Sequence, residues 1–396
     1  MSSLVLRDAL VVDVTSGRIE EKDIWVREGK LVSAPAPGET APGGTYIDLG
    51  GAYVLPGLID CHTHLGIIEE ATGKIGVDNN EISNPVTPGL RGIDAVNPVD
   101  IAFQDAVKSG ITTVMSGPGS DNVVGGQSLA LKTYGTIIDK MLLRHPVGLK
   151  IALGENPITT YGQDKRCPVT RMATAALVRE LFLRTQDYME LKARGRIRRR
   201  EMQLEAVIPV LTGEISLRAH AHRADDIVTA IRIAEEFGIK KLVIEHGTEA
   251  DIVKEYLKER NIPVAFGPML TPRIKMELRK RNYGSVVRLA EAGIKVALIT
   301  DHPYNSIDQL RTIAALAVAE GLSPLEAMRS VTIHPAEILE CDHRVGKIEP
   351  GLDADLVVFD GPPLDINSKV LLTMIDGTIV YRKPVNSTGA RHETAR

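Results

Sequence analysis

The chain has 396 residues, of which 43% are hydrophobic and 25% are charged, and its formal net charge is -4 at pH 7. This length suits one large α/β domain with a smaller accessory domain. The acidic balance argues against a general nucleic-acid binder or a protein of anionic membrane surfaces. Aromatic residues, at 4%, are too few for a base-stacking platform.

Cysteine content and the first residues bear on the compartment. The three cysteines, Cys61, Cys167 and Cys341, are widely separated and odd in number, so a disulfide framework is not expected. The N-terminus lacks the basic and apolar regions of a signal peptide, and no run approaches the length that spans a bilayer. We therefore expect a cytoplasmic protein that binds neither nucleic acid nor membrane.

Residues 4–54 contain short apolar runs separated by Gly, Pro and Asp turns, which predicts an all-β segment. From residue 97 onward, amphipathic helical patterns alternate with short apolar strands, and a glycine-rich loop is expected at 117–127. The expected strands are 111–115, 149–154, 215–220, 241–246, 262–266 and 294–301. A β pattern returns at 344–381, where Asp376-Gly377 predicts a hairpin turn.

Alternating strands and helices over roughly 250 residues indicate a parallel α/β architecture. About eight βα units fit, the number in a (β/α)8 TIM barrel. A doubly wound open sheet is the alternative, but no Gly-x-Gly-x-x-Gly follows a first strand. We expect a TIM-barrel hydrolase domain with a small β-sandwich built from both chain ends. The expected parts are residues 1–54 and 343–396 for the sandwich and 55–342 for the barrel.

An apolar run at residues 54–61 ends in His62-Thr63-His64. Side chains alternate along a strand, so these two imidazoles are expected to face the same way. Two imidazoles at the end of a buried strand are half of a metal site. A lone pair of this kind is as often a surface or capping pair, so the other half has to come from the rest of the chain.

Other predicted strands also end in polar residues. In a barrel of parallel strands, the active site lies at the C-terminal strand ends. His220, with His222 beyond it, ends one strand; His246 ends the next, and Asp301 ends the last. Because the barrel brings these ends together, we expect a metal site there. Imidazole and carboxylate suit zinc, or manganese, iron, cobalt or nickel.

Lys150 lies within an otherwise apolar strand. A buried lysine is costly unless it has a role, and one role for a neutral amine is to react with carbon dioxide and form a carbamate that bridges two metal ions. The alternative is a lysine that extends to the strand end. Glu155, just past the strand, is a competing bridging carboxylate.

Four motifs resemble the amidohydrolase superfamily, and the resemblance covers nearly the whole chain. They are Gly57-Leu58-Ile59-Asp60-Cys61-His62-Thr63-His64, Ile244-Glu245-His246-Gly247-Thr248, Thr300-Asp301-His302-Pro303, and Val331-Thr332-Ile333-His334-Pro335 with Gly346 to Val358. The pattern His220-Ala221-His222 followed by Glu245-His246-Gly247 is similar to the imidazolonepropionase-related and prolidase-like branch.

The resemblance implies a divalent metal, expected to be zinc as one or two ions. The implied ligands are His62, His64, His220, His246 and Asp301, with a bridge from the fourth strand. It also implies that a metal-bound water loses its proton to Asp301, attacks a carbonyl, and that Asp301 then protonates the leaving nitrogen. His222, Arg223 and His302 are candidate substrate contacts, and the choice between His220 and His222 as the fifth-strand ligand stays open.

Deaminating members of the superfamily usually carry a glutamate three residues after the fifth-strand histidine. Here the residue three after His220 is Arg223, and the residue three after His222 is Asp225. We therefore favour hydrolysis of an amide or cyclic amide of a small molecule. A deaminase or imidazolonepropionase-type ring hydrolase comes second, and a non-catalytic scaffold third. We also expect a homo-oligomer.

Overall fold

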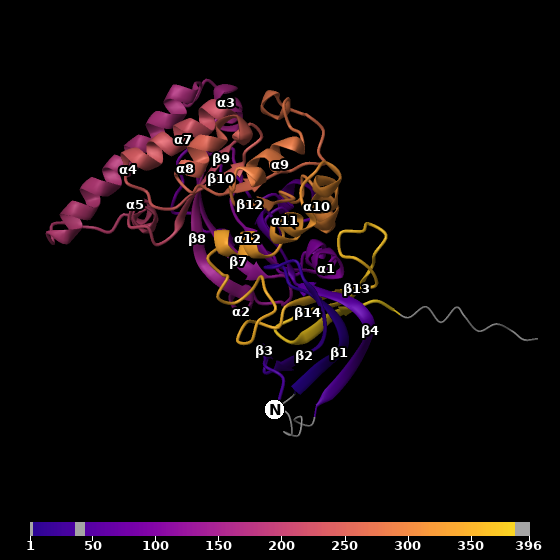
Figure 1. The fold of residues 1–396 in the computed structure, drawn as a ribbon. Helices are drawn as coiled ribbons and strands as arrows, with labels where there is room; N and C mark the ends of the chain where they lie inside the picture. The colour runs from indigo at the N-terminus through magenta and orange to yellow at the C-terminus, as the bar shows by residue number, and fades with distance from the viewer. Residues whose placement is uncertain (1–2, 36–43, 385–396) are drawn as a thin grey trace, which may run out of the picture.

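The computed structural model describes residues 3–35 and 44–384, which form two β-sheets, one of them surrounded by helices (Figure 1). The strands of the first sheet are β5 (Leu58–Thr63), β6 (Ile111–Ser116), β7 (Val124–Lys132), β8 (Leu142–Ala152), β9 (Ser216–Ala221), β10 (Leu242–His246), β11 (Val264–Phe266) and β12 (Val296–Leu298). Hydrogen bonds join them in the order β12-β11-β10-β9-β8-β7-β6-β5. The predicted α/β class is confirmed.

The first sheet curves until its two edges meet. Just beyond the last strand, the amide of Asp301 donates to the carbonyl of His62 at 3.2 Å, and the amide of His64 donates to the carbonyl of His302 at 2.9 Å. These bonds join the segment that follows β12 to the C-terminal end of β5. The predicted eight-stranded barrel is therefore confirmed as a nearly closed barrel.

Strand β7 departs from the predicted order. It pairs antiparallel with both β6 and β8, whereas the other paired neighbours in the barrel run parallel. The predicted glycine-rich loop at 117–127 is wrong at its end, because residues from Val124 onward are strand. Gly126 has φ +126°, and a Cβ there would lie 2.5 Å from the carbonyl oxygen of Leu90. This glycine is needed for a close backbone approach and not for a turn.

Helices pack on the outside of the barrel (Figure 1). They are α1 (Ile101–Lys108), α2 (Ile138–Met141), α3 (Glu155–Gly162), α4 (Arg171–Ala193), α5 (Met202–Glu205), α6 (Ile208–Leu211), α7 (Ala224–Glu236), α8 (Lys254–Glu259), α9 (Gly284–Glu291), α10 (Leu310–Ala319), α11 (Pro324–Arg329) and α12 (Ile333–Ile338). None of the helices in the described ranges is both long and apolar enough to cross a membrane.

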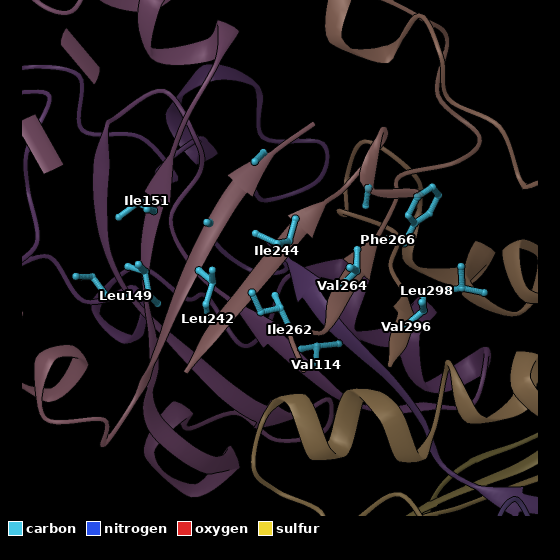
Figure 2. Packing of buried hydrophobic residues seen from close by; sticks show 14 of the residues in the cluster. Val114, Leu149, Ile151, Leu242, Ile244, Ile262, Val264, Phe266, Val296 and Leu298 are labelled. Atoms are coloured by element: carbon cyan, nitrogen blue, oxygen red, sulfur yellow. The ribbon is translucent and has the colours of Figure 1, made fainter. Parts of the chain in front are cut away.

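The faces of β10 show how the core is divided. Leu242 and Ile244 belong to the large apolar cluster that also contains Ile227 of α7, so they face the helices (Figure 2). Val243, between them, belongs to a smaller cluster with Ala265 of β11 and other strand residues. Alternate residues of the strand therefore face the helix layer and the barrel interior, as period-two alternation requires.

The second sheet is built from both chain ends. Its strands are β1 (Ser3–Val12), β2 (Ile19–Arg27), β3 (Lys30–Val32), β4 (Thr45–Pro56), β13 (Leu356–Phe359), β14 (Val370–Ile375) and β15 (Thr378–Arg382). β13 pairs antiparallel with β4 and so joins the two ends, which surround an apolar cluster of their own. The expected β unit from both chain ends is confirmed, as a single seven-stranded sheet. Asp376 and Gly377, at φ 48° and 71°, form the predicted hairpin turn.

Candidate metal-binding active site

Five histidines and one aspartate meet at the C-terminal end of the barrel strands. Each is at most 7% exposed, and all six line one cavity of about 370 Å³. They are His62, His64, His220, His222, His246 and Asp301. The ring centroid of His246 lies 4.9 Å from that of His62 and 4.3 Å from that of His220. The barrel thus brings together side chains that are more than 200 residues apart in the sequence.

Two sets of donor atoms are close enough to hold a metal ion. One consists of His62, His246 and Asp301, and the other of His220, His222 and His246. Within each set the donor atoms lie within 4.8 Å of one another. Asp301 Oδ1 is 3.2 Å from His62 Nε2 and 3.4 Å from His64 Nε2, which adds His64 to the first set. The two sets outline two ion positions, and His246, which belongs to both sets, can bind only one ion at a time through its single free nitrogen.

Backbone carbonyls hold two of the rings in place. Nδ1 of His64 lies 2.8 Å from the carbonyl oxygen of Gly117, and Nδ1 of His246 lies 2.9 Å from that of Gly267. A carbonyl oxygen can only accept, so each Nδ1 carries the hydrogen and each Nε2 keeps a free electron pair. This is the arrangement in which metal-ligating histidines are usually found.

The backbone is strained at two of these residues. His246 has φ 74° and Asp301 has φ 56°, a left-handed conformation that is uncommon for residues other than glycine. Strict alternation would place His246 with Ile244, on the helix side of β10. The left-handed turn at the strand end instead brings the His246 ring beside that of His62. Strain of this kind collects at functional sites, where surrounding structure enforces it.

Burial sets the protonation of the cluster. It lowers the pKa of His246 to about 3 and holds the pKa values of His220 and His222 well below the ordinary value. Burial acts to raise the pKa of Asp301, but the adjoining imidazole rings of His62 and His64 outweigh it, and that pKa lies far below its usual range. The neutral imidazoles of His220, His222 and His246 beside an ionised carboxylate are in the protonation states that bind metal. Burial acts to lower the pKa of His62, but the charge of Glu245 outweighs it and raises that pKa.

A charge network lies directly below the cluster, with Glu245 at its centre. Glu245 Oε1 is 2.9 Å from His62 Nδ1 and accepts from Arg218 Nε at 2.7 Å. Glu245 Oε2 contacts the Lys150 ammonium. Burial tends to raise the pKa of Glu245, but the charges of His62, Lys150 and Arg218 hold it well below normal. Sequence reasoning did not select Glu245 as a site residue, although it precedes His246 in a quoted motif.

Both candidates for the fourth-strand bridge line the cavity. Lys150 is 3% exposed, on β8, and its charge contributes to the low pKa of both His220 and His222, so it lies close to the ring cluster. Glu155 begins α3, and its carboxylate accepts from the backbone amide of Glu277 at 3.4 Å. The lysine therefore lies among the histidines, and the glutamate lies on the cavity wall.

The three candidate substrate contacts are placed differently. His222 lines the cavity. Arg223 donates to the exposed Asp225 carboxylate at 2.9 Å, and neither of these two residues belongs to the cavity lining. His302 is fully buried outside the lining, where its Nδ1 accepts from the amide of Ile307 at 3.2 Å. The structure brings only His222 to the cavity.

Several lining residues were missed by sequence reasoning. One of them, Thr160, lies on α3. The others lie in irregular segments, where no period marks which side chain faces the cavity: Asn80, Ser120, Asp121, Lys275 and Tyr304. Lys275 Nζ donates to Asn156 Oδ1 at 2.8 Å, and Asn156 Nδ2 donates to Ser120 Oγ at 2.7 Å. These bonds link the loop after β11 to α3 and to the loop before β7. The outer cavity wall is therefore polar, and hydrogen bonds join the segments that form it.

The donor set fits a divalent metal. Both ring nitrogens of His220 are buried and have no hydrogen-bond partner among the described residues. Buried polar atoms are normally satisfied, so an unsatisfied imidazole facing other imidazoles points to a missing ligand. Nitrogen donors with one carboxylate match the preferences of zinc and related transition metals.

Comparison with known proteins places this site in a family. Residues 53–380 match the Amidohydrolase family. The chain is 26% identical over 395 residues to the amidohydrolase tasK of Hapsidospora irregularis, which covers 92% of this chain and 40% of that protein. It is 24% identical over 403 residues to an imidazolonepropionase of Psychrobacter cryohalolentis, covering 92% and 88% respectively. The chain therefore spans less than half of the first relative and most of the second.

Solved structures agree with this placement. An amidohydrolase from Thermotoga maritima MSB8 matches with a TM-score of 0.93 and 40% identity, over 96% of this chain and 100% of that one. A prolidase complexed with N-methylphosphonate-L-proline matches with a TM-score of 0.62 and 21% identity, over 96% and 100%, which shows the shared fold alone. The resemblance expected from the motifs is confirmed, and the chain belongs to the amidohydrolase family.

Proposed function

We propose that this protein is a metal-dependent hydrolase that cleaves a C–N bond, in an amide or cyclic amide, of a small molecule. The observation that carries the proposal is the meeting of His62, His64, His220, His246 and Asp301, from four strand ends, in one buried cavity. Family membership supports the reaction class. The cavity volume suits a small substrate and not a long peptide.

The five converging residues would hold the metal, for which we propose zinc, and Lys150 is the favoured fourth-strand bridge because it lies among the rings. A divalent ion held there supplies Lewis-acid polarisation of the scissile carbonyl and lowers the pKa of a water towards neutrality. Glu245 keeps the His62 ring oriented through its Nδ1. Burial of all these groups excludes bulk water and strengthens their electrostatic interactions.

Asp301 is the proposed proton carrier. It is ionised at neutral pH, and Oδ1 lies at the centre of the cluster, 3.2 Å from His62 Nε2. A carboxylate in this place can accept the proton of the attacking water and then deliver it to the leaving nitrogen. One residue thereby acts first as general base and then as general acid.

The position of Asp225 supports hydrolysis of an amide over deamination. A deaminase of this family would need an acid that reaches the ring nitrogen of its substrate. Asp225 is exposed at the start of α7, pairs with Arg223 and does not line the cavity. The acid expected three residues after His222 therefore does not face the proposed reaction centre.

The test is turnover of a substrate panel by zinc-loaded and chelator-treated protein. The panel contains N-acyl amino acids, dipeptides and cyclic amides, with adenine and other aminated heterocycles as the deaminase arm. We expect hydrolysis of at least one amide, abolished by chelation and restored by zinc. Ammonia release from the heterocycles alone would favour the deaminase, and a fully loaded protein inactive on every arm would favour the non-catalytic scaffold.

Three further predictions accompany this proposal. They are a homo-oligomeric state, a cytoplasmic location, and a division of the chain into residues 1–54, 55–342 and 343–396. Size-exclusion chromatography with light scattering addresses the oligomeric state.

A further inference from the structure

His222 has the surroundings of a metal ligand, although the family resemblance assigns only one ligand to the fifth strand. His220 lies within β9 and His222 follows one residue after its end, so the two side chains leave the same face. Both are at most 3% exposed, and their ring centroids are 4.8 Å apart. Two histidines at this spacing repeat, on β9, the arrangement of His62 and His64 on β5.

The His222 ring is held in the same way as the rings on the other strands. Its Nδ1 lies 2.8 Å from the hydroxyl oxygen of Thr248, which is 3% exposed and follows β10. In His64 and His246 the atom in this position is a backbone carbonyl oxygen. A hydroxyl can accept in the same manner, which leaves Nε2 of His222 for the cavity. Such an outer hydrogen bond fixes both the ring orientation and the tautomer of a metal-binding histidine.

We infer that His222 is a metal ligand and that, with His220 and His246, it forms a three-imidazole ion position beside the one that contains Asp301; this rests on the proposed metal centre. The three donor atoms lie within 4.8 Å of one another. Nitrogen ligands about 2.1 Å from one tetrahedral ion lie about 3.4 Å apart, so binding requires the rings to move together, by up to about 1.4 Å in the widest pair.

The two ion positions differ in charge. The position with Asp301 has an anionic ligand, whereas the position with His222 has three neutral ones. A three-histidine set with an open fourth place is a known form of catalytic zinc site and needs no carbamate to complete it. Ion binding at this second position is therefore expected without carbon dioxide.

The test measures metal binding and does not depend on turnover. His222→Gln is compared with wild type and with His343→Gln, which removes an exposed histidine. Co²⁺ is titrated into metal-free protein in carbon dioxide-depleted buffer, with the visible absorption spectrum as readout and the bound metal counted by mass spectrometry. We expect His222→Gln to lower the affinity for one of the two ions by about 100-fold or more. Loss of an outer hydrogen-bond partner typically lowers metal affinity by only about 10–100-fold. Thr248→Val is expected to fall within that smaller range.

Unchanged cobalt affinity, stoichiometry and spectrum in His222→Gln would overturn the inference, whatever the protein hydrolyses. If His222→Gln does not fold, X-ray absorption of cobalt-loaded wild type decides the matter by counting imidazoles. With both positions filled, five imidazoles shared by two ions, or about 2.5 per ion, support the inference, and two or fewer per ion contradict it. Absence of turnover with normal metal binding would instead count against the proposed function.

Discussion

Two buried polar clusters in this protein differ in how their charges are satisfied. At the C-terminal end of the barrel strands, both ring nitrogens of His220 lack a hydrogen-bond partner within residues 3–35 and 44–384. At the junction with the second sheet, Lys132 of β7 is 3% exposed, yet it contacts Asp355 and lies 3.0 Å from Asp353 and 3.2 Å from Asp376. The first cluster has donor atoms left for a ligand, whereas the second supplies its own counter-charges.

The contrast separates a ligand-binding site from a structural junction, which we call the joint and which consists of Lys132, Asp353, Asp355 and Asp376. Asp353 also pairs with Arg344 at 2.7 Å and contacts Lys30, so the joint connects β7 and β3 to the chain before β13. A buried ion pair of this kind holds elements in register but adds little net stability over an apolar packing. Backbone conformation does not separate the two clusters, because Asp376 of the joint is left-handed, as are His246 and Asp301. Buried charge alone therefore does not identify function, whereas converging imidazole nitrogens without hydrogen-bond partners among the described residues indicate a ligand site.

The comparison is tested most strongly at Asp301. Asp301→Asn keeps the shape of the side chain but cannot carry the proton, so turnover should fall by about 10²–10⁴-fold or become undetectable. Metal content, measured by mass spectrometry, should stay largely intact. Asp308→Asn, at an exposed carboxylate nearby, is the matched control. Full activity in Asp301→Asn would rule out the proposed proton carrier.

Removing the central charge of the joint should lower the stability of the fold and leave metal binding unchanged. Lys132→Met leaves buried carboxylates without their main counter-charge, and we expect the free energy of unfolding to fall by about 3–5 kcal/mol. Urea unfolding measures the change, and Lys22→Met, in an exposed pair with Glu20, should change little. Loss of metal binding by folded Lys132→Met would contradict the separation of joint and site.

The two fourth-strand candidates can be separated by metal affinity. Lys150→Met should weaken binding of the ion beside Asp301 by about 10–100-fold, because it removes either a bridge or the partner that orients Glu245. Glu155→Gln should have a smaller effect, since its carboxylate lies on the wall. Bicarbonate dependence of metal loading in wild type, absent in Lys150→Met, would identify carboxylation. If Glu155→Gln weakened metal binding more than Lys150→Met, Glu155 and not Lys150 would be the bridging residue.

The smallest expected effect is the pH dependence of the joint. Burial tends to raise the pKa of Asp353, but the charge of Lys132, with contacts to Lys30 and Arg344, lowers it to about 2. A depressed carboxyl pKa gives stability that is present above the unfolded value near 3.8 and lost as pH falls through 2. Metal-free wild type should lose at most about 2 kcal/mol from this group between pH 4 and pH 2. Asp353→Asn, followed by urea unfolding, should lack this component.

The strand ends of the site could be predicted because each is an apolar run closed by a ligand-type residue. His62, His220 and Asp301 needed only the alternation of side chains and the convergence of barrel strands. His246 was predicted in the same way, as the end of an apolar strand, although strict alternation would turn Glu245 inward and His246 outward. The left-handed φ at His246 resolves this conflict, and no pattern in a single sequence reveals such a dihedral.

Other features depend on long-range packing, which local patterns do not record. The start of β7, up to Gln127, was predicted as part of a glycine-rich loop, yet Gly126 serves the close approach of Leu90. The cavity-lining loops are likewise held by bonds between distant segments, as between Lys275 and Asn156. Local periodicity predicts regular elements and their ends, but it does not predict which loop residues form the outer wall of the cavity.

Anomalous diffraction at the zinc edge, from crystals of zinc-loaded protein, is the most direct test of the central claim. We expect a peak in the cavity about 2.0–2.2 Å from Nε2 of His62, Nε2 of His64 and a carboxylate oxygen of Asp301. We expect no peak at the joint around Lys132. Zinc-soaked crystals with no anomalous peak among these histidines would contradict the account.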